Sequence, residues 1–296
     1  MKLPAEAPPW FFIALGCALL TAGCDAVSKR IMQDIDEWTT GAMVLLVSGV
    51  ALLPLISCME FGPVSLDLLV VLAVTIPLEV LGYYFFLSAL RLAPLSLVLP
   101  LLAFTPVLTA LTAFVMLGEQ IGGYGVVGIG LVTVGAYILY TDPGKFNPAA
   151  PIKAIFSSPG SRRMLMTAAI WSLTVTLGKK GILIYGAIQF GFLIIVFAAV
   201  CFGAMSLVRL KLGVARVDPT VYVAVLFVLA GVLMAGAQVT HFVSLSMAPV
   251  AYMISVKRIS MVFGVIFGWL FFNESNIGYR LIASSVMVGG LFFLYQ

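Results

Sequence analysis

The chain has 296 residues, of which 62% are hydrophobic and only 9% are charged. Soluble domains carry about 25% charged residues because their surface faces water, so this composition excludes a soluble globular protein and predicts a surface that faces lipid. The net charge of +4 is small and scattered along the chain, and it does not indicate nucleic acid as a partner.

Regularly spaced apolar stretches run along the whole chain and predict helices. A helix that spans a bilayer needs about 20 mostly apolar residues. We therefore predict an all-α membrane protein with ten transmembrane helices joined mostly by short loops. The ten helices are expected near residues 10–31, 41–59, 66–90, 95–117, 121–140, 164–183, 186–208, 220–246, 250–272 and 276–295.

One connection is longer than the others. Residues 142–163 are rich in Pro, Gly and Ser and carry several basic side chains, which is typical of a linker. The linker separates a first half, residues 1–141, from a second half, residues 164–296, and we expect each half to contain five helices.

The first apolar stretch ends in Ala22-Gly23-Cys24, as a bacterial lipoprotein leader would. The segment before it balances Lys2 with Glu6 and lacks the positive charge of a leader, so we interpret it as the first transmembrane helix. The four cysteines lie in apolar stretches without CxxC spacing, and the chain has one histidine. No metal site and no disulfide framework are predicted from this pattern.

The two halves resemble each other in sequence. Because five helices is an odd number, the second half must enter the bilayer from the opposite side, and inverted repeats of this kind are a recurrent transporter design. We therefore predict two inverted five-helix repeats around a central cavity that works by alternating access. The equivalent positions are Ala93-Pro94 and Ala248-Pro249, Glu119 and Glu274, and Gly135 and Gly290 at a shift of 155, and Lys29-Arg30 and Lys179-Lys180 at a shift of 150.

The repeated motifs resemble those of the EamA-type members of the drug/metabolite transporter superfamily. One copy is Ala89-Leu-Arg-Leu-Ala-Pro94 followed by Leu117-Gly-Glu119; the other is Ser244-Leu-Ser-Met-Ala-Pro249 followed by Phe272-Asn-Glu274, with Asn273 in place of glycine. The resemblance implies a transporter in the bacterial inner membrane, a small-molecule substrate, no cofactor and no enzymatic activity. Superfamily substrates include amino acids, drugs, nucleotide sugars and phosphorylated metabolites, so the resemblance does not name the substrate.

Two adjacent cations lie deep in the ninth predicted helix. A charge at the bilayer centre costs at least about 2.5–3.5 kcal/mol, so it usually serves a function. Lys257 and Arg258 are similar to the Lys-Arg pair with which phosphate translocators of the superfamily hold phosphate. Lys257 shares a helix face with Gly264 and Gly268, whose spacing lets another helix pack closely. We predict that both cations bind substrate; a structural ion pair is the alternative.

Further charges lie within the predicted helices. Glu79 is near the middle of the third, and either neutralises Lys257 or Arg258 or couples transport to protons. Asp25 and Lys29 are four residues apart on one helix face and are able to pair. Lys29 and Lys179 occupy equivalent positions in the two halves, so we also predict that they contact the substrate from both sides of the cavity.

Three polar residues are further candidates. His241 is either a proton carrier or a hydrogen-bonded core residue. Gln238 and Tyr83 are equivalent at the shift of 155 and are predicted to form hydrogen bonds with the substrate. Glu119 and Glu274 each precede a helix, and we expect their carboxylates to cap the turn, because unpaired amides at a helix start favour negative charge.

The leading functional prediction is a secondary transporter for an anionic or carboxylate-bearing metabolite. The alternative is an exporter of amino acids or other neutral or cationic solutes, in which the intramembrane cations form structural pairs. The sequence leaves open whether transport is coupled to protons and whether the protein is a monomer or a homodimer. The loop charges favour termini outside the cytoplasm, whereas the resemblance favours termini inside it.

Overall fold

The computed structural model describes residues 8–117, 123–140, 150–213 and 220–293, and every regular element in these ranges is a helix. The elements are α1 (Pro9–Ile31), α2 (Glu37–Ile56), α3 (Leu66–Leu92), α4 (Leu95–Val98), the 3₁₀ helix η1 (Leu99–Ala103), α5 (Phe104–Leu117), α6 (Gly123–Tyr140), α7 (Ala150–Ser157), α8 (Pro159–Tyr185), α9 (Ala187–Lys211), α10 (Val221–Met247), α11 (Val250–Lys257), α12 (Ser260–Phe272) and α13 (Ile277–Phe293).

Short polar residues and prolines determine where several of these helices begin and end. Ser65 accepts a hydrogen bond from the amide of Leu68 at the start of α3, and Thr220 does the same at the start of α10. Both helices end at an alanine in extended conformation, Ala93 or Ala248, which precedes a proline. The residue before proline is driven out of the helical region, so the sequence stops the helix there.

Seven helical segments in the described part of the chain are long and apolar enough to cross a membrane, which confirms an all-helical, multi-pass integral membrane protein. They are Pro9–Ile31, Glu37–Ile56, Leu66–Leu92, Leu95–Met116, Ala187–Lys211, Val221–Met247 and Val250–Phe272. The other long helices are α6, α8 and α13; α13 has 17 residues, and α8 is less apolar because it contains four basic residues. Ten spans therefore remain a prediction.

The structure differs from the predicted elements in three places. The expected linker contains α7, and α8 begins at Pro159 rather than near residue 164. The fourth and ninth predicted helices are also interrupted: η1 separates α4 from α5, and Arg258 and Ile259 form a turn between α11 and α12. Pro100 lacks an amide hydrogen, which accounts for the first interruption.

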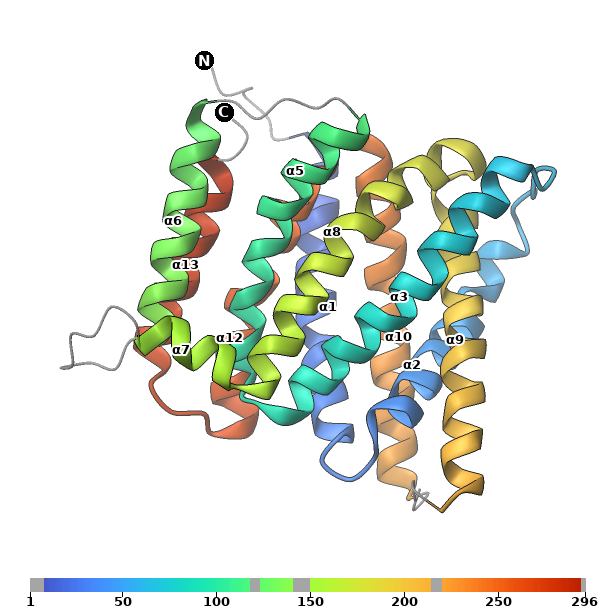
Figure 1. Ribbon diagram of the computed structural model, residues 1–296. Helices are drawn as coiled ribbons and strands as arrows, with labels where there is room; N and C mark the ends of the chain where they lie inside the picture. Colours follow the sequence, from blue (N-terminus) through green and yellow to red (C-terminus); the bar gives the residue numbers. More distant parts are fainter. Residues whose placement is uncertain (1–7, 118–122, 141–149, 214–219, 294–296) are drawn as a thin grey trace.

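Helices from the two halves pack against each other in pairs. The most extensive contacts join α1 to α10, α3 to α8, α6 to α13 and α2 to α9 (Figure 1). Small residues permit these close approaches: a Cβ atom on Gly82 of α3 would lie 2.9 Å from Trp171 Nε1 of α8. Where a bilayer supplies no hydrophobic drive between helices, such packing is what holds them together.

Candidate substrate cavity

A cavity of about 130 Å³ lies among the helices that pair across the two halves. A water molecule occupies about 10–15 Å³ on this measure, so the cavity has room for on the order of ten waters or for a small metabolite. Its polar wall consists of Thr21, Cys24, Asp25, Ser28, Thr75, Glu79, Tyr83, Trp171, Thr174, Gln238, His241, Lys257 and Arg258. Aromatic and aliphatic side chains complete it, among them Leu45, Phe86, Phe190, Ile194 and Phe242.

The two predicted cations line the cavity at the interruption of the ninth predicted helix. Lys257 is the last residue of α11, and its Nζ lies 3.4 Å from Nδ1 of His241 on α10. Arg258 follows in the turn and is 3% exposed. Its Nε has no hydrogen-bond partner within the described ranges. A buried N–H without an acceptor costs about 1–3 kcal/mol, more when the group is charged.

Asp25 belongs to this cluster rather than to Lys29. Its side chain is 6% exposed, and the charges that act on it most strongly are those of Lys257 and Arg258. Lys29 instead donates a 2.6 Å hydrogen bond to the carbonyl of Ala93. The pairing of Asp25 with Lys29 that their helical spacing allows is not the one seen here, because side chains from other helices reach both residues.

Glu79 faces the same cavity from α3. Thr174 and Trp171 of α8 lie beside its carboxyl group, and Lys257 acts on it across the cavity. The structure thus places Glu79 where the charge of Lys257 acts on it. The interpretation that Glu79 neutralises Lys257 requires this placement. Tyr83, one turn further along α3, and Gln238, one turn before Phe242 on α10, both line the cavity as well.

Lys29 and Lys179 do not line the cavity. Lys179 Nζ donates to the carbonyls of Leu245 at 2.6 Å and of Ala248 at 3.1 Å, at the end of α10. Lys29 makes the equivalent contact with Ala93 at the end of α3. Each lysine thus satisfies carbonyls that a helix end leaves unpaired. This geometry gives no support to their predicted contact with substrate.

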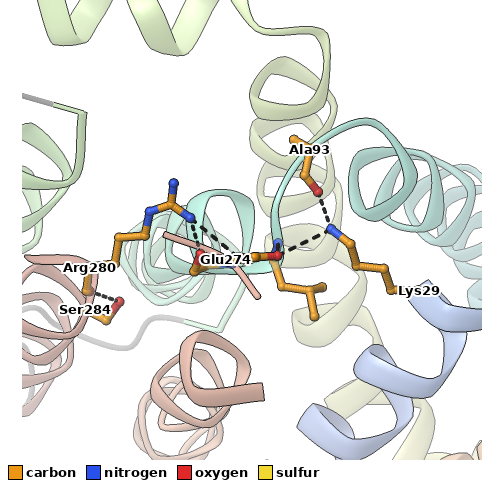
Figure 2. A network of polar contacts seen from close by, with 7 residues as sticks. Lys29, Ala93, Glu274, Arg280 and Ser284 are labelled. Atoms are coloured by element: carbon orange, nitrogen blue, oxygen red, sulfur yellow. Dashed lines mark hydrogen bonds and ion pairs between the residues drawn. The ribbon is translucent and has the colours of Figure 1, made fainter. Parts of the chain in front are cut away.

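Glu274 joins the two halves of the chain. It lies between α12 and α13, yet its carboxylate accepts hydrogen bonds from the amides of Leu95 at 2.7 Å and Ser96 at 2.9 Å. Lys29 Nζ lies 3.6 Å and an Arg280 nitrogen 3.4 Å from its oxygens (Figure 2). We expected Glu274 to cap its own turn. It instead caps α4 of the other half, and Glu119 lies outside the described residues.

The glycines of α12 accommodate two different groups. A Cβ atom on Gly264 would collide with the side chain of Leu99, so η1 of the first half packs directly against this position. On Gly268 it would lie 2.7 Å from a carboxylate oxygen of Glu274. The two glycines therefore admit η1 and the Glu274 carboxylate, rather than one continuous helix.

Several cavity residues were not among the sequence candidates. Thr75 Oγ1 is buried and has no hydrogen-bond partner among the residues that the structure describes, and Trp171 lies beside the carboxyl group of Glu79. Thr174 and Cys24 also line the cavity. The repeat gave no signal for them: at the shift of 150, Thr174 is equivalent to Cys24 and Trp171 to Thr21, and neither of those was a candidate. Only the cavity shows that these positions face inward.

This architecture defines a multi-pass membrane protein with a polar cavity enclosed by its helices. Residues 8–141 match the model of the EamA-like transporter family. The matched segment therefore belongs to that family, which is part of the drug/metabolite transporter superfamily. Members of the family are membrane transporters of small solutes rather than enzymes.

A solved structure, described only as "Crystal structure of protein", shares the fold. It is 18% identical, has a TM-score of 0.70, and the match covers 96% of this chain and 95% of the other. At this identity the likeness shows the fold alone. No curated protein matches the sequence.

Proposed function

We propose that the protein is a secondary transporter that moves a small carboxylate-bearing metabolite across the bacterial inner membrane by alternating access. The observation that carries this proposal is the position of two adjacent cations, Lys257 and Arg258, in the cavity wall. A guanidinium group holds a carboxylate through charge-assisted hydrogen bonds in a fixed geometry. A bound carboxylate would therefore be paired with the two cations of the wall.

The lining of the cavity supports the inverted repeat. Many lining positions form pairs related by the shifts found in the sequence, so both members of a pair face the same space from opposite halves. Those pairs are Thr21 and Trp171, Cys24 and Thr174, Asp25 and Val175, Ser28 and Gly178, and Leu45 and Ile195 at the shift of 150, and Glu79 and Met234, Tyr83 and Gln238, Phe86 and His241, and Leu102 and Lys257 at the shift of 155. A cavity at the interface of two repeats is where transporters of this design bind substrate.

The helix interruptions support alternating access. Leu102 in η1 and Lys257 at the end of α11 are equivalent positions, and both line the cavity. A stretch of 3₁₀ geometry within a helix often marks a hinge, and discontinuous helices often form transporter sites. Each half thus has one point at which its fourth helix could bend. Bending there would let the cavity change from opening on one side of the membrane to opening on the other.

Glu274 and its partners are where we infer that one end of the cavity closes. Leu90 lies between the cavity wall and Ala93 along α3, and it is 0% exposed. Leu99 lies between the cavity wall and Leu95 along η1 and α4, and it is 2% exposed. Beyond them, the Glu274 carboxylate ties α4 to Lys29 and Arg280. Opening this end would require those contacts to separate, as a transport cycle demands.

The alternative function is export of amino acids or other neutral or cationic solutes, and one observation favours it. Asp25 lies within the field of both Lys257 and Arg258, so the cations already have a counter-charge. In that case Lys257 and Arg258 would stabilise the protein and would not contact the substrate. The two functions differ in what happens to ligand binding when one cation is removed.

The test is a thermal-shift screen of the purified protein in detergent, because a ligand that binds the native state raises the melting temperature. Carboxylates, phosphorylated metabolites and organic cations are compared on the wild type, Lys257→Ala and Arg258→Lys. Lys180→Ala is the matched control, because Lys180 lies outside the cavity wall. Carboxylates that stabilise the wild type and the control but neither cavity variant support the proposal. Equal stabilisation of all four proteins by a neutral or cationic solute would contradict it.

A further inference from the structure

Two side chains extend the contacts of Glu274 beyond the capping of α4. The buried hydroxyl of Ser96 donates a hydrogen bond to the Glu274 carboxylate, and an Arg280 nitrogen donates to the oxygen of the same hydroxyl. That nitrogen also lies 3.4 Å from an oxygen of Glu274 (Figure 2). Ser96 belongs to the first half of the chain, whereas Glu274 and Arg280 belong to the second. The three side chains therefore form a closed polar triangle across the interface of the two halves.

The equivalent positions cannot form a second triangle at the other end of the cavity. At the shift of 155, Ser96 is equivalent to Ala251 and Arg280 to Gly125. Alanine has no hydroxyl group, and glycine has no side chain that could carry a cation. The lysine near the end of the first helix, by contrast, is present in both halves. The two repeats thus differ in the polar groups with which each can close its own end.

The apolar layers behind the polar groups are matched between the two ends. Leu90 of α3 is equivalent to Leu245 of α10, and Leu95 at the start of α4 is equivalent to Val250 at the start of α11. All four side chains are 0% exposed. Because the free energy of apolar burial is roughly proportional to the area buried, these layers resist opening to a similar extent at both ends. Among these equivalent positions, the polar triangle is therefore what distinguishes the two ends.

Opening the cavity beside Glu274 has to separate the triangle, because a movement of one half away from the other at this point breaks the contacts of Ser96. The separated groups regain hydrogen bonds to water, but charge-assisted hydrogen bonds within a buried site still give a net stabilisation. An interaction that is present in only one of two states shifts the equilibrium towards that state. The triangle therefore favours the state that is closed at this end.

We propose that Ser96 and Arg280 are positioning residues that set the resting state of the protein. In the absence of substrate they hold the cavity closed at the end formed by Glu274, and they thereby favour opening at the opposite end, where Lys179 meets the carbonyls of α10. This inference rests on the proposed transport function and adds which of its two states the unliganded protein prefers. The end at which substrate first binds is then determined by two side chains that only one repeat has at these positions.

The experiment compares two engineered thiols at equivalent positions, Leu95→Cys and Val250→Cys, neither of which lines the cavity. Each full-length protein is treated with N-ethylmaleimide in detergent without ligand, and mass spectrometry of the digested protein gives the modification rate of that thiol alone. In the wild-type background Val250→Cys is expected to react at least tenfold faster than Leu95→Cys. Arg280→Ala is expected to lower this ratio at least fivefold. Arg162→Ala, which removes an exposed cation from the start of α8, is expected to keep it.

The two rates together distinguish gating from a loss of stability. Unfolding would accelerate the modification of both thiols, whereas loss of the triangle accelerates it at Leu95→Cys and slows it at Val250→Cys; the melting temperature is measured in parallel. If Arg280→Ala does not fold, Ser96→Ala keeps every charge and is expected to lower the ratio in the same direction. A wild-type ratio of one or less, or a ratio that neither variant changes, would overturn the proposed resting state and leave alternating access intact. Modification of neither thiol in any variant would overturn both.

Discussion

The carboxylate of Glu274 and the backbone amide of Ser96 form a 2.9 Å hydrogen bond, although the two residues are 178 positions apart. The same carboxylate accepts from the amide of Leu95 and lies 3.6 Å from Lys29 Nζ. One side chain therefore caps a helix of the first half, neutralises a cation of that half and is itself carried by the second half. Its removal should be felt on both sides of the interface.

Replacing Glu274 by alanine is expected to lower the free energy of unfolding by about 3–5 kcal/mol, because Lys29 and Arg280 would lose their buried counter-charge. The measurement is the melting temperature in detergent. Glu60→Ala serves as the control, since Glu60 is exposed. A Glu274→Ala protein as stable as the control would show that the contacts to Leu95 and Ser96 contribute nothing to the fold.

Lys29→Met and Lys179→Met are expected to destabilise the protein without changing which ligands it binds. Each substitution leaves a helix-end carbonyl unpaired at Ala93 or Ala248, and a buried polar group without a partner costs about 1–3 kcal/mol. The ligand panel is measured on both variants and on Lys180→Met. Loss of carboxylate binding in a variant that remains folded would restore the prediction that these lysines contact substrate.

Gly135 and Gly290 are equivalent positions at the contact of α6 with α13. A Cβ atom on Gly135 would lie 2.9 Å from the carbonyl oxygen of Ala283, and one on Gly290 would lie 2.9 Å from that of Gly128. Because backbone atoms cannot move aside, each glycine-to-alanine change is expected to cost about 1–3 kcal/mol. Gly130→Ala is the control, since a Cβ there would contact nothing. Equal melting temperatures for all three variants would show that the helices are not closely packed at this point.

Arg258→Lys is expected to weaken carboxylate binding by about tenfold or more. Lysine keeps the charge but loses the planar array of donors, and charge-assisted hydrogen bonds contribute about 1.5–3 kcal/mol. The readout is the dissociation constant from ligand titration, with protein stability measured in parallel. An unchanged dissociation constant would indicate that Arg258 serves as a counter-charge to Asp25 and does not hold the ligand.

Much of the architecture was predictable, because the reasons for it are local. Apolar runs of the required length reveal spanning helices, and Ala93-Pro94 and Ala248-Pro249 mark where α3 and α10 end. The cost of a charge in lipid singled out Lys257 and Arg258, which do line the cavity. The interruption of α11 and α12 was missed because its turn contains no proline or glycine.

The pairing of charges was decided only by the tertiary structure. By helical spacing alone Asp25 and Lys29 share a face, but Asp25 meets the cations of α11 and its following turn, and Lys29 meets Glu274. Helical periodicity determines the direction of a side chain, whereas its partner depends on which helix packs against that face. In this chain the packing partners come from the other half, so sequence distance carries no information about them.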